Sequence, residues 1–188
     1  MTSTPPSVPP TASPPASNPP RGRWSRLWRH ACCDEADARR LLPADAQQRL
    51  ADHVRLSEAR HDAEIRVCVE ASLPLAEVWR GVQARERALD AFAQLRVWDT
   101  ERNNGVLIYL LLADHAIEIV ADRGLRHAVA AADWQRIAQV LGEALSAAHP
   151  EEGLHQAIDA VSALLDEHFP PDPHWPVNNE LPDRPVVR

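Results

Sequence analysis

One uninterrupted apolar run constrains the fold of this 188-residue chain more than any other feature. Residues 105–112 read Gly-Val-Leu-Ile-Tyr-Leu-Leu-Leu, which is the length of a strand and offers no polar face. Such a run is typical of a strand that other elements cover on both faces. After the turn Ala113-Asp114-His115, a second β-rich run follows at 116–121, and the shortness of the turn predicts an antiparallel hairpin.

Strand and helix periods alternate around that hairpin. Residues 64–70 alternate and are β-branched, so they predict a strand, whereas residues 84–96 have the apolar spacing of a helix. A strand–helix–strand unit makes strands 64–70 and 105–112 a parallel pair. The sequence therefore predicts an α/β fold, a three-layer α/β/α sandwich on a small mixed sheet with one parallel pair and one β-hairpin. Further helices are predicted from Pro43 onward, over 133–148 and over 150–167.

Proline and charge divide the chain into four segments. Residues 1–20 hold eight of the 17 prolines and predict a disordered leader, with a PxxP ligand as the alternative. Residues 21–42 form a basic, Trp-containing segment, residues 43–168 the globular domain, and residues 169–188 a Pro-rich tail. All 20 basic residues are Arg, and residues 1–30 carry four of them and no acid, against 16 Arg and 27 acidic residues in the remainder. This excess of acid excludes a nucleic-acid-binding domain, which needs a broad basic face.

The basic segment contains an apolar stripe. Trp24, Leu27 and Trp28 recur at helical spacing between Arg residues, a pattern that favours peripheral contact with a membrane or a protein partner. The alternative is a short helix docked on its own domain, because ten residues make a marginal free helix. No secretory signal and no membrane-spanning run is visible, so we expect a cytoplasmic protein that is peripheral to a membrane where this stripe docks.

The predicted topology gathers polar residues at one edge of the sheet, which we call the polar rim. The starts of strands 64–70 and 105–112 meet the end of strand 116–121 there. Carboxylates with amide oxygens suit a hard cation such as Ca²⁺ or Mg²⁺, and Arg pairs with phosphate. The other interpretation is that these are ordinary turn residues. The polar rim consists of Asp62, Glu64, Asp99, Glu101, Arg102, Asn103, Asn104, Asp122, Arg123 and Gly124.

Ligands of open α/β sheets usually bind at the other edge, beyond the carboxyl ends of the parallel strands. Here that opposite rim holds a thinner set, Glu70, Ser72, Asp114 and His115. A nucleophile with an adjacent base is not visible at either rim. The stretch 33–39 matches the C-x5-R loop of cysteine phosphatases, but its three acids would repel phosphate and keep the thiol protonated. Whether the protein is an enzyme stays open at this point.

Four separated segments resemble the TPM domain family. They are Arg102-Asn-Asn-Gly-Val-Leu-Ile-Tyr109, Ile117-Glu-Ile-Val-Ala-Asp-Arg-Gly124, Glu64-Ile-Arg-Val and Glu151-Glu-Gly-Leu154. The resemblance covers roughly residues 45–168 and implies a Rossmann-like α/β/α domain. The stretch 179–187 is similar to the ending of short bacterial members that have neither a signal peptide nor a membrane anchor.

The resemblance also implies two functions. Family members include a thylakoid-lumen protein of photosystem II repair with acid phosphatase activity, Ca²⁺-binding proteins and an accessory subunit of an ion-channel receptor. Bacterial relatives are often encoded beside LemA-type membrane proteins. We therefore expect an accessory or regulatory protein that binds a divalent cation and acts with a membrane-associated or LemA-type partner. The alternative is a weak, cation-assisted acid phosphatase in which a metal-bound water attacks a phosphomonoester.

Candidate site residues combine the polar rim with this resemblance. Glu64, Asp122 and Asn104 are the candidate ligands of Ca²⁺ or Mg²⁺. Arg102 and Arg123 are candidates to steady a phosphate. Asn104, Gly105 and Gly124 complete the candidate ligand-binding set, because glycines allow a backbone to approach a ligand closely. The residues that match the family signature are Glu64, Asn104, Gly105, Asp122 and Gly124.

Overall fold

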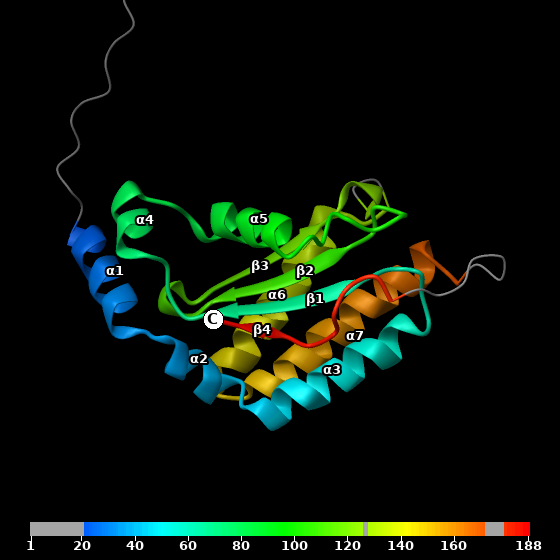
Figure 1. Ribbon diagram of the computed structural model, residues 1–188, viewed down its shortest axis with the longest axis horizontal. Coiled ribbons are helices and arrows are strands. Elements are labelled where there is room, and N and C mark those ends of the chain that lie inside the picture. The colour runs from blue at the N-terminus through cyan, green and yellow to red at the C-terminus, as the bar shows by residue number, and fades with distance from the viewer. Residues whose placement is uncertain (1–20, 126–127, 172–178) are drawn as a thin grey trace, which may run out of the picture.

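The computed structural model describes residues 21–125, 128–171 and 179–188. Within these ranges, helices lie on both faces of one four-stranded sheet, so the predicted three-layer α/β/α architecture is confirmed (Figure 1). The predicted leader, residues 1–20, lies outside the described residues, as does the 172–178 part of the predicted tail. None of the helices in the described ranges has the length and apolar character needed to cross a bilayer.

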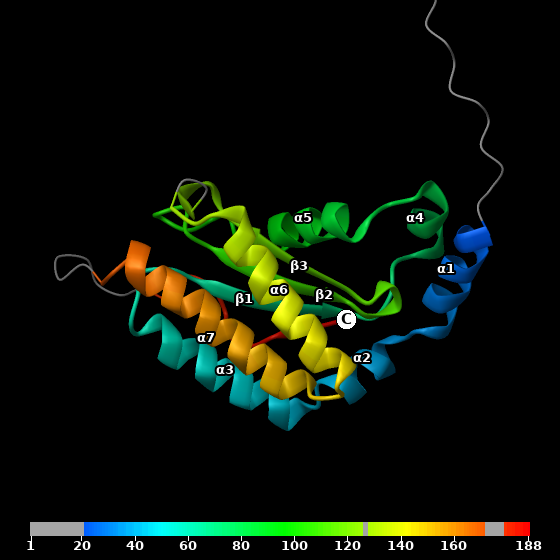
Figure 2. The same ribbon diagram turned by 180° about the vertical axis from the view of Figure 1, so that it is seen from behind.

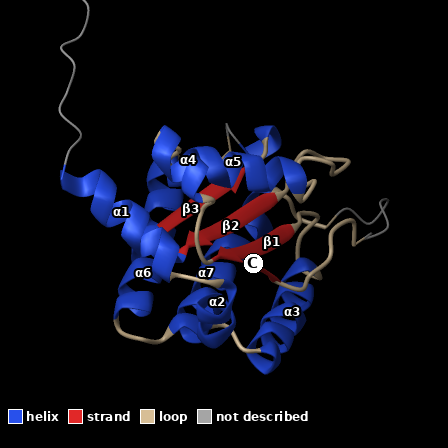
Figure 3. Cartoon of the chain, turned by 60° about the vertical axis from the view of Figure 1, so that its left-hand side comes forward, coloured by secondary structure: helices blue, strands red, loops and turns tan. Residues whose placement is uncertain are grey.

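The sheet has the strand order β3-β2-β1-β4. Strand β1 (Ile65–Glu70) lies parallel to β2 (Val106–Leu111), and β2 lies antiparallel to β3 (Ala116–Ala121), as the sequence predicted (Figure 3). Strand β4 (Val186–Val187) adds a second parallel pairing on the free edge of β1. The sequence did not predict β4, because two residues carry no period that distinguishes a strand.

Three long helices form the layer behind the sheet (Figure 2). They are α3 (Ala44–Glu58), α6 (Ala131–Ser146) and α7 (Pro150–His168), and the shorter α2 (Glu35–Leu41) lies at their end. Prolines open two of them, since Pro43 precedes the first turn of α3 and Pro150 occupies the first turn of α7. The apolar core of this layer includes Leu50, Val54, Ile65, Val67, Val69, Ile108, Leu141, Ile158 and Val161.

The opposite layer is thinner and is built by α5 (Ala84–Gln94), α4 (Leu75–Arg80) and α1 (Arg21–Cys32), with α1 packed on α4. Helix α5 lies over β2 and β3, so it leaves this face of β1 to another element. Residues 179–188 cover this face of β1, and Leu181 is buried in the apolar core between this layer and the sheet, which we call the second core. The sequence did not predict α2 or α4, which have seven and six residues. The second core includes Cys68, Val78, Phe92, Leu107, Tyr109, Leu111 and Val120.

Candidate functional site

The polar rim forms where the topology predicted it. Arg102, in the loop before β2, pairs with Asp62, before β1, with 2.6 Å between Nη1 and Oδ2. From the far side, Arg123 donates from Nε to Asn103 Oδ1 at 2.8 Å. The backbone N–H of Gly124 donates to the Asn103 carbonyl at 2.9 Å. Three segments that are distant in sequence therefore meet at the amino-terminal edge of the parallel pair.

Asn104 and the two glycines hold these loops together. Asn104 is buried, and its side-chain Nδ2 donates to the carbonyl of Asp62. A Cβ on Gly105 would overlap the Val97 carbonyl oxygen, and one on Gly124 would lie 2.5 Å from a backbone oxygen of the facing loop. The close approach that the glycines permit is thus between two backbone segments of this chain.

The carboxylates of the two candidate metal ligands, Glu64 and Asp122, differ in how many of their oxygens already accept hydrogen bonds. Glu64 is 6% exposed, and its two oxygens accept the backbone N–H groups of Glu180 at 3.0 Å and Leu181 at 3.3 Å. Burial raises the pKa of Glu64 above its ordinary value despite these bonds. One oxygen of Asp122 accepts the Arg123 N–H at 2.6 Å, while Oδ2 is buried with no hydrogen-bond partner among the described residues.

A cation at this rim would have to compete with protein partners. Glu64 would exchange two N–H donors for the ion, and Asp62 would have to leave Arg102. Within residues 21–125, 128–171 and 179–188, no group of three or more His, Cys, Asp or Glu side chains is arranged to hold a metal ion. Ca²⁺ or Mg²⁺ on Glu64, Asp122 and Asn104 therefore stays a prediction.

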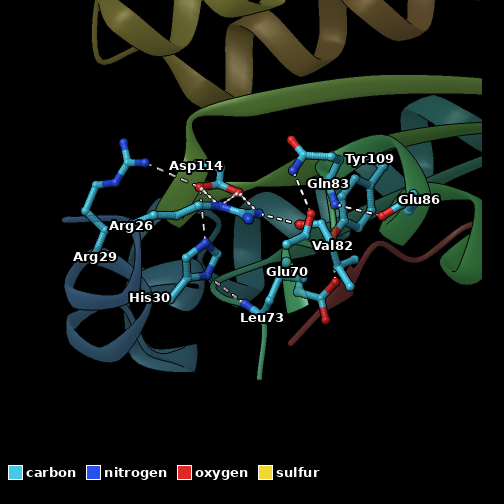
Figure 4. A network of polar contacts seen from close by, with 11 residues as sticks. Arg26, Arg29, His30, Glu70, Leu73, Val82, Gln83, Glu86, Tyr109 and Asp114 are labelled. Carbon is cyan, nitrogen blue, oxygen red and sulfur yellow. Dashed lines mark hydrogen bonds and ion pairs between the residues drawn. The ribbon is translucent and has the colours of Figure 1, made fainter. Parts of the chain in front are cut away.

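The opposite rim contains a largely buried ionic cluster that links α1 to the domain (Figure 4). Asp114, just after β2, accepts two hydrogen bonds from Arg26, from Nε at 3.0 Å and from Nη2 at 2.7 Å. His30 Nε2 lies 3.1 Å from the same carboxylate. Arg26 also donates to the Val82 carbonyl at 2.6 Å, and the N–H of Leu73 donates to His30 Nδ1 at 2.9 Å. Two side chains of α1 thus contact the segments that flank α4 and the turn that follows β2.

The surroundings of Asp114 and His30 determine the ionisation of both side chains. Burial alone would raise the pKa of Asp114, but Arg26 and His30 hold it below its usual value. Burial lowers the pKa of His30, and a Nδ1 that accepts the Leu73 N–H must be unprotonated. His30 is therefore neutral, with its proton on Nε2 facing Asp114.

A second buried cluster surrounds Glu70 at the end of β1. Arg87 of α5 binds its carboxylate through Nη2 at 2.6 Å and Nε at 2.9 Å, and the Tyr109 hydroxyl donates to it at 2.5 Å. Arg188 Nε lies 3.3 Å away. Burial alone would raise the pKa of Glu70, but the bonds from Arg87 and Tyr109 hold it below its usual value.

Sequence reasoning placed Glu70 and Asp114 at this rim but missed their partners. Arg26 and His30 are four apart on α1 and share a helix face, which is the one signal that could have paired them with an acid. The other two members of the opposite rim take no part in either cluster; Ser72 is half-buried and His115 is exposed.

Helices α1 and α4 also expose a cluster that we call the aromatic–arginine surface. Trp24 and Trp28 of α1 are 65% and 73% exposed, and Trp79 of α4 is 54% exposed. The rings of Trp24 and Trp79 meet edge to face with centroids 6.0 Å apart, and the Arg23 guanidinium lies over Trp79. Leu27, the third member of the predicted stripe, instead packs on the second core. The surface consists of Arg23, Trp24, Trp28, Leu75, Trp79 and Arg80.

Known proteins resemble this chain both in sequence and in fold. The sequence model of the TPM domain matches residues 36–164, so the chain belongs to the TPM domain family. It is similar to the BA42 protein of the psychrophilic bacterium Bizionia argentinensis, with 26% identity, a TM-score of 0.67, and coverage of 77% of this chain and 94% of that one. An N-terminal domain from P. gingivalis shares the fold at 20% identity and a TM-score of 0.51, covering 73% and 90% of the two chains. No match was found among curated proteins.

Proposed function

We propose that this TPM-domain chain is an accessory protein that binds the surface of anionic membranes through its aromatic–arginine surface. The observation that carries the proposal is the exposure of Trp24, Trp28 and Trp79 on two helices that touch each other. Exposed aromatic clusters of this kind mark interaction sites, and Trp rings favour the headgroup region of a bilayer.

Charge favours an anionic lipid over an uncharged surface. Arg23 lies over the Trp79 ring, Arg80 is exposed and follows Trp79 in the sequence, and neither has an acidic partner among the described residues. Each basic residue near an anionic membrane contributes about 1 kcal/mol. The cluster around Asp114 fixes α1 in advance, so binding does not have to fold a free 12-residue helix. The protein would then encounter a membrane-associated partner, LemA-type by family resemblance, at the surface of the membrane.

Sedimentation with lipid vesicles tests the proposal. The full chain is expected to sediment with vesicles containing phosphatidylglycerol, less with phosphatidylcholine alone, and less as salt rises. The double substitution Trp24→Ser with Trp28→Ser should weaken binding at least tenfold. Trp98→Ser is the matched control, because Trp98 is 50% exposed but lies after α5. Absence of sedimentation, or equal loss in the control, contradicts the proposal and leaves a protein partner as the occupant.

Cation-assisted hydrolysis of phosphomonoesters at the polar rim is a second proposal. One observation favours it, the buried Asp122 Oδ2 that lacks a partner among the described residues beside Arg123. Turnover of p-nitrophenyl phosphate should then require Ca²⁺ or Mg²⁺ and be lost in Asp122→Ala but not in Asp166→Ala, the control on α7 with a similar unpartnered oxygen. Ca²⁺ should also shift the amide resonances of Glu180 and Leu181, which now bind Glu64. Turnover that survives Asp122→Ala contradicts hydrolysis at this site.

A further inference from the structure

A cavity of about 600 Å³ opens at the carboxyl end of β2, and no function proposed above uses it. We call it the carboxyl-end pocket. Its floor is the end of β2, where Leu110 and Leu111 are buried, and its walls come from α2, β3 and α6. Small-molecule sites typically have volumes of about 300–1,000 Å³. This is also the edge of a parallel strand pair at which open α/β sheets usually bind ligands.

The walls of the carboxyl-end pocket are mostly apolar. Leu41, Leu112, Ile117 and Leu145 line it, and each is only partly buried by the fold. A ligand in the pocket would remove these side chains from water. Because burial of apolar surface is favourable, these side chains favour an apolar ligand.

Among the described residues that line this space, no charged side chain is unpaired. Asp37 accepts the Asp34 N–H at 2.9 Å and pairs with Arg40. Burial and nearby Asp37 raise the pKa of the Cys33 thiol, which is therefore neutral. His115 lines the pocket, and its side chain has no hydrogen-bond partner among the described residues, so its imidazole is available to donate or accept a hydrogen bond.

Glycine keeps one wall open. Gly142 lies in the interior of α6, where Gly is less favourable than Ala. A Cβ there would meet only Ile117 Cδ1, at an ordinary 3.5 Å, so packing does not require the glycine. What the missing side chain preserves is space in the carboxyl-end pocket.

From these observations we propose that the carboxyl-end pocket binds an uncharged, mainly apolar small molecule whose single hydroxyl, amide or amine group hydrogen-bonds to His115. The proposal is independent of membrane docking, since none of the lining residues belongs to the aromatic–arginine surface. It concerns binding only and involves no reaction.

The neutral dye 1-aminoanthracene is a suitable probe, because its ring system is apolar and carries one amine. In the full ¹⁵N-labelled chain, it should shift the amide resonances of Leu112, His115 and Gly142. Gly142→Leu, which fills the space, should weaken binding at least tenfold, and His115→Ala severalfold. Val140→Leu is the control, because Val140 is on the same helix but lines a separate groove between α6 and α7.

Three results would overturn the proposal. The first is an absence of shifts at the carboxyl-end pocket. The second is shifts confined to the α6–α7 groove or to Trp24 and Trp28. The third is unchanged affinity in Gly142→Leu. If that variant does not fold, alkylation of Cys33 in a Cys32→Ser chain replaces it, because bound probe must slow the reaction of a thiol that lines the pocket. Unchanged alkylation contradicts the proposal.

Discussion

Arg26 and Asp114 lie 88 positions apart in the chain, yet the Arg26 guanidinium donates two hydrogen bonds to the Asp114 carboxylate, from Nε and from Nη2. This pair, with His30, is what fixes α1 against the domain. Because the side chains of Arg26 and Asp114 are 16% and 12% exposed, water screens their contact only weakly.

Asp114→Asn should therefore loosen α1 while the sheet stays folded. Hydrogen bonds to charged groups contribute about 1.5–3 kcal/mol each, and the substitution removes the charge that Arg26 and His30 share. Hydrogen exchange should accelerate in the amides of Arg21–Cys32 and remain slow in β1 and β2. Arg39→Ala, which removes an exposed ion pair with Glu35, is the control and should leave α1 protected. Equal protection of α1 in both variants contradicts the assignment.

Two buried histidines should make stability fall with acidity. Burial lowers the pKa of both His30 and His61, and each Nδ1 accepts a backbone N–H, from Leu73 and Ala63. The unfolded chain takes up these protons near pH 6.5, before the folded chain does, so their contribution is fully present well above that pH and is lost as the pH falls through this range toward the lowered pKa values of the folded chain. Urea denaturation across this range measures the loss. His61→Gln should reduce the slope, and an unchanged slope would show that His61 does not contribute.

Substitutions at Glu70 and Tyr109 compare the loss of a buried ion pair with the loss of a single hydrogen bond. Tyr109→Phe removes one hydrogen bond to Glu70 and should cost about 1 kcal/mol of unfolding free energy. Glu70→Ala leaves the Arg87 guanidinium without its buried partner, which typically costs about 3–5 kcal/mol. Urea denaturation gives both values. If Glu70→Ala costs no more than Tyr109→Phe, the Glu70–Arg87 pair is not the centre of this cluster.

The three thiols should react at three different rates. Cys32 is exposed and Cys33 is half-buried with a raised pKa, whereas burial raises the pKa of Cys68 to about 11. Because the thiolate is the reacting species, a disulfide reagent at neutral pH should modify Cys32 first, Cys33 more slowly, and Cys68 only on unfolding. Mass spectrometry of timed samples gives the order. Early modification of Cys68 would mean that the layer containing α5 opens readily.

Gly105 should tolerate no side chain. A Cβ there would overlap the carbonyl oxygen of Val97, and overpacking of this kind costs about 1–3 kcal/mol or more. Gly105→Ala should lower the thermal midpoint by many degrees and disturb the polar rim. Gly22→Ala is the control, since an added Cβ meets nothing within 4 Å and Ala favours α1. A normal midpoint for Gly105→Ala would place the loop before β2 elsewhere.

Periodicity made most of the fold predictable. The change from helical spacing to alternation at residue 64, and the apolar run of 105–112, suffice for the parallel pair and the hairpin, and the structure has both. Short elements escaped, because α2, α4 and β4 are too brief to show a period.

The sequence predicted where the residues of the candidate site lie but not which groups they bind. Turn residues at strand ends placed Asp62, Arg102 and Arg123 at one edge, since topology alone fixes which strand ends meet. Nothing local to Glu64 indicates that its carboxylate binds N–H groups 116 and 117 positions away. Such long-range pairings depend on the whole fold.

Strand β4 has a consequence for association between molecules. Arg188 donates to the Val69 carbonyl at 3.0 Å and accepts the Ala71 N–H at 2.7 Å, so it occupies backbone groups on the outer edge of β1. An unpaired strand edge is a template on which a foreign strand can add. A chain shortened before Val186 would present that edge, flanked by the apolar side chains of β1, to other copies of itself. The few residues that return to the sheet thereby occupy a strand edge with which another copy could otherwise pair.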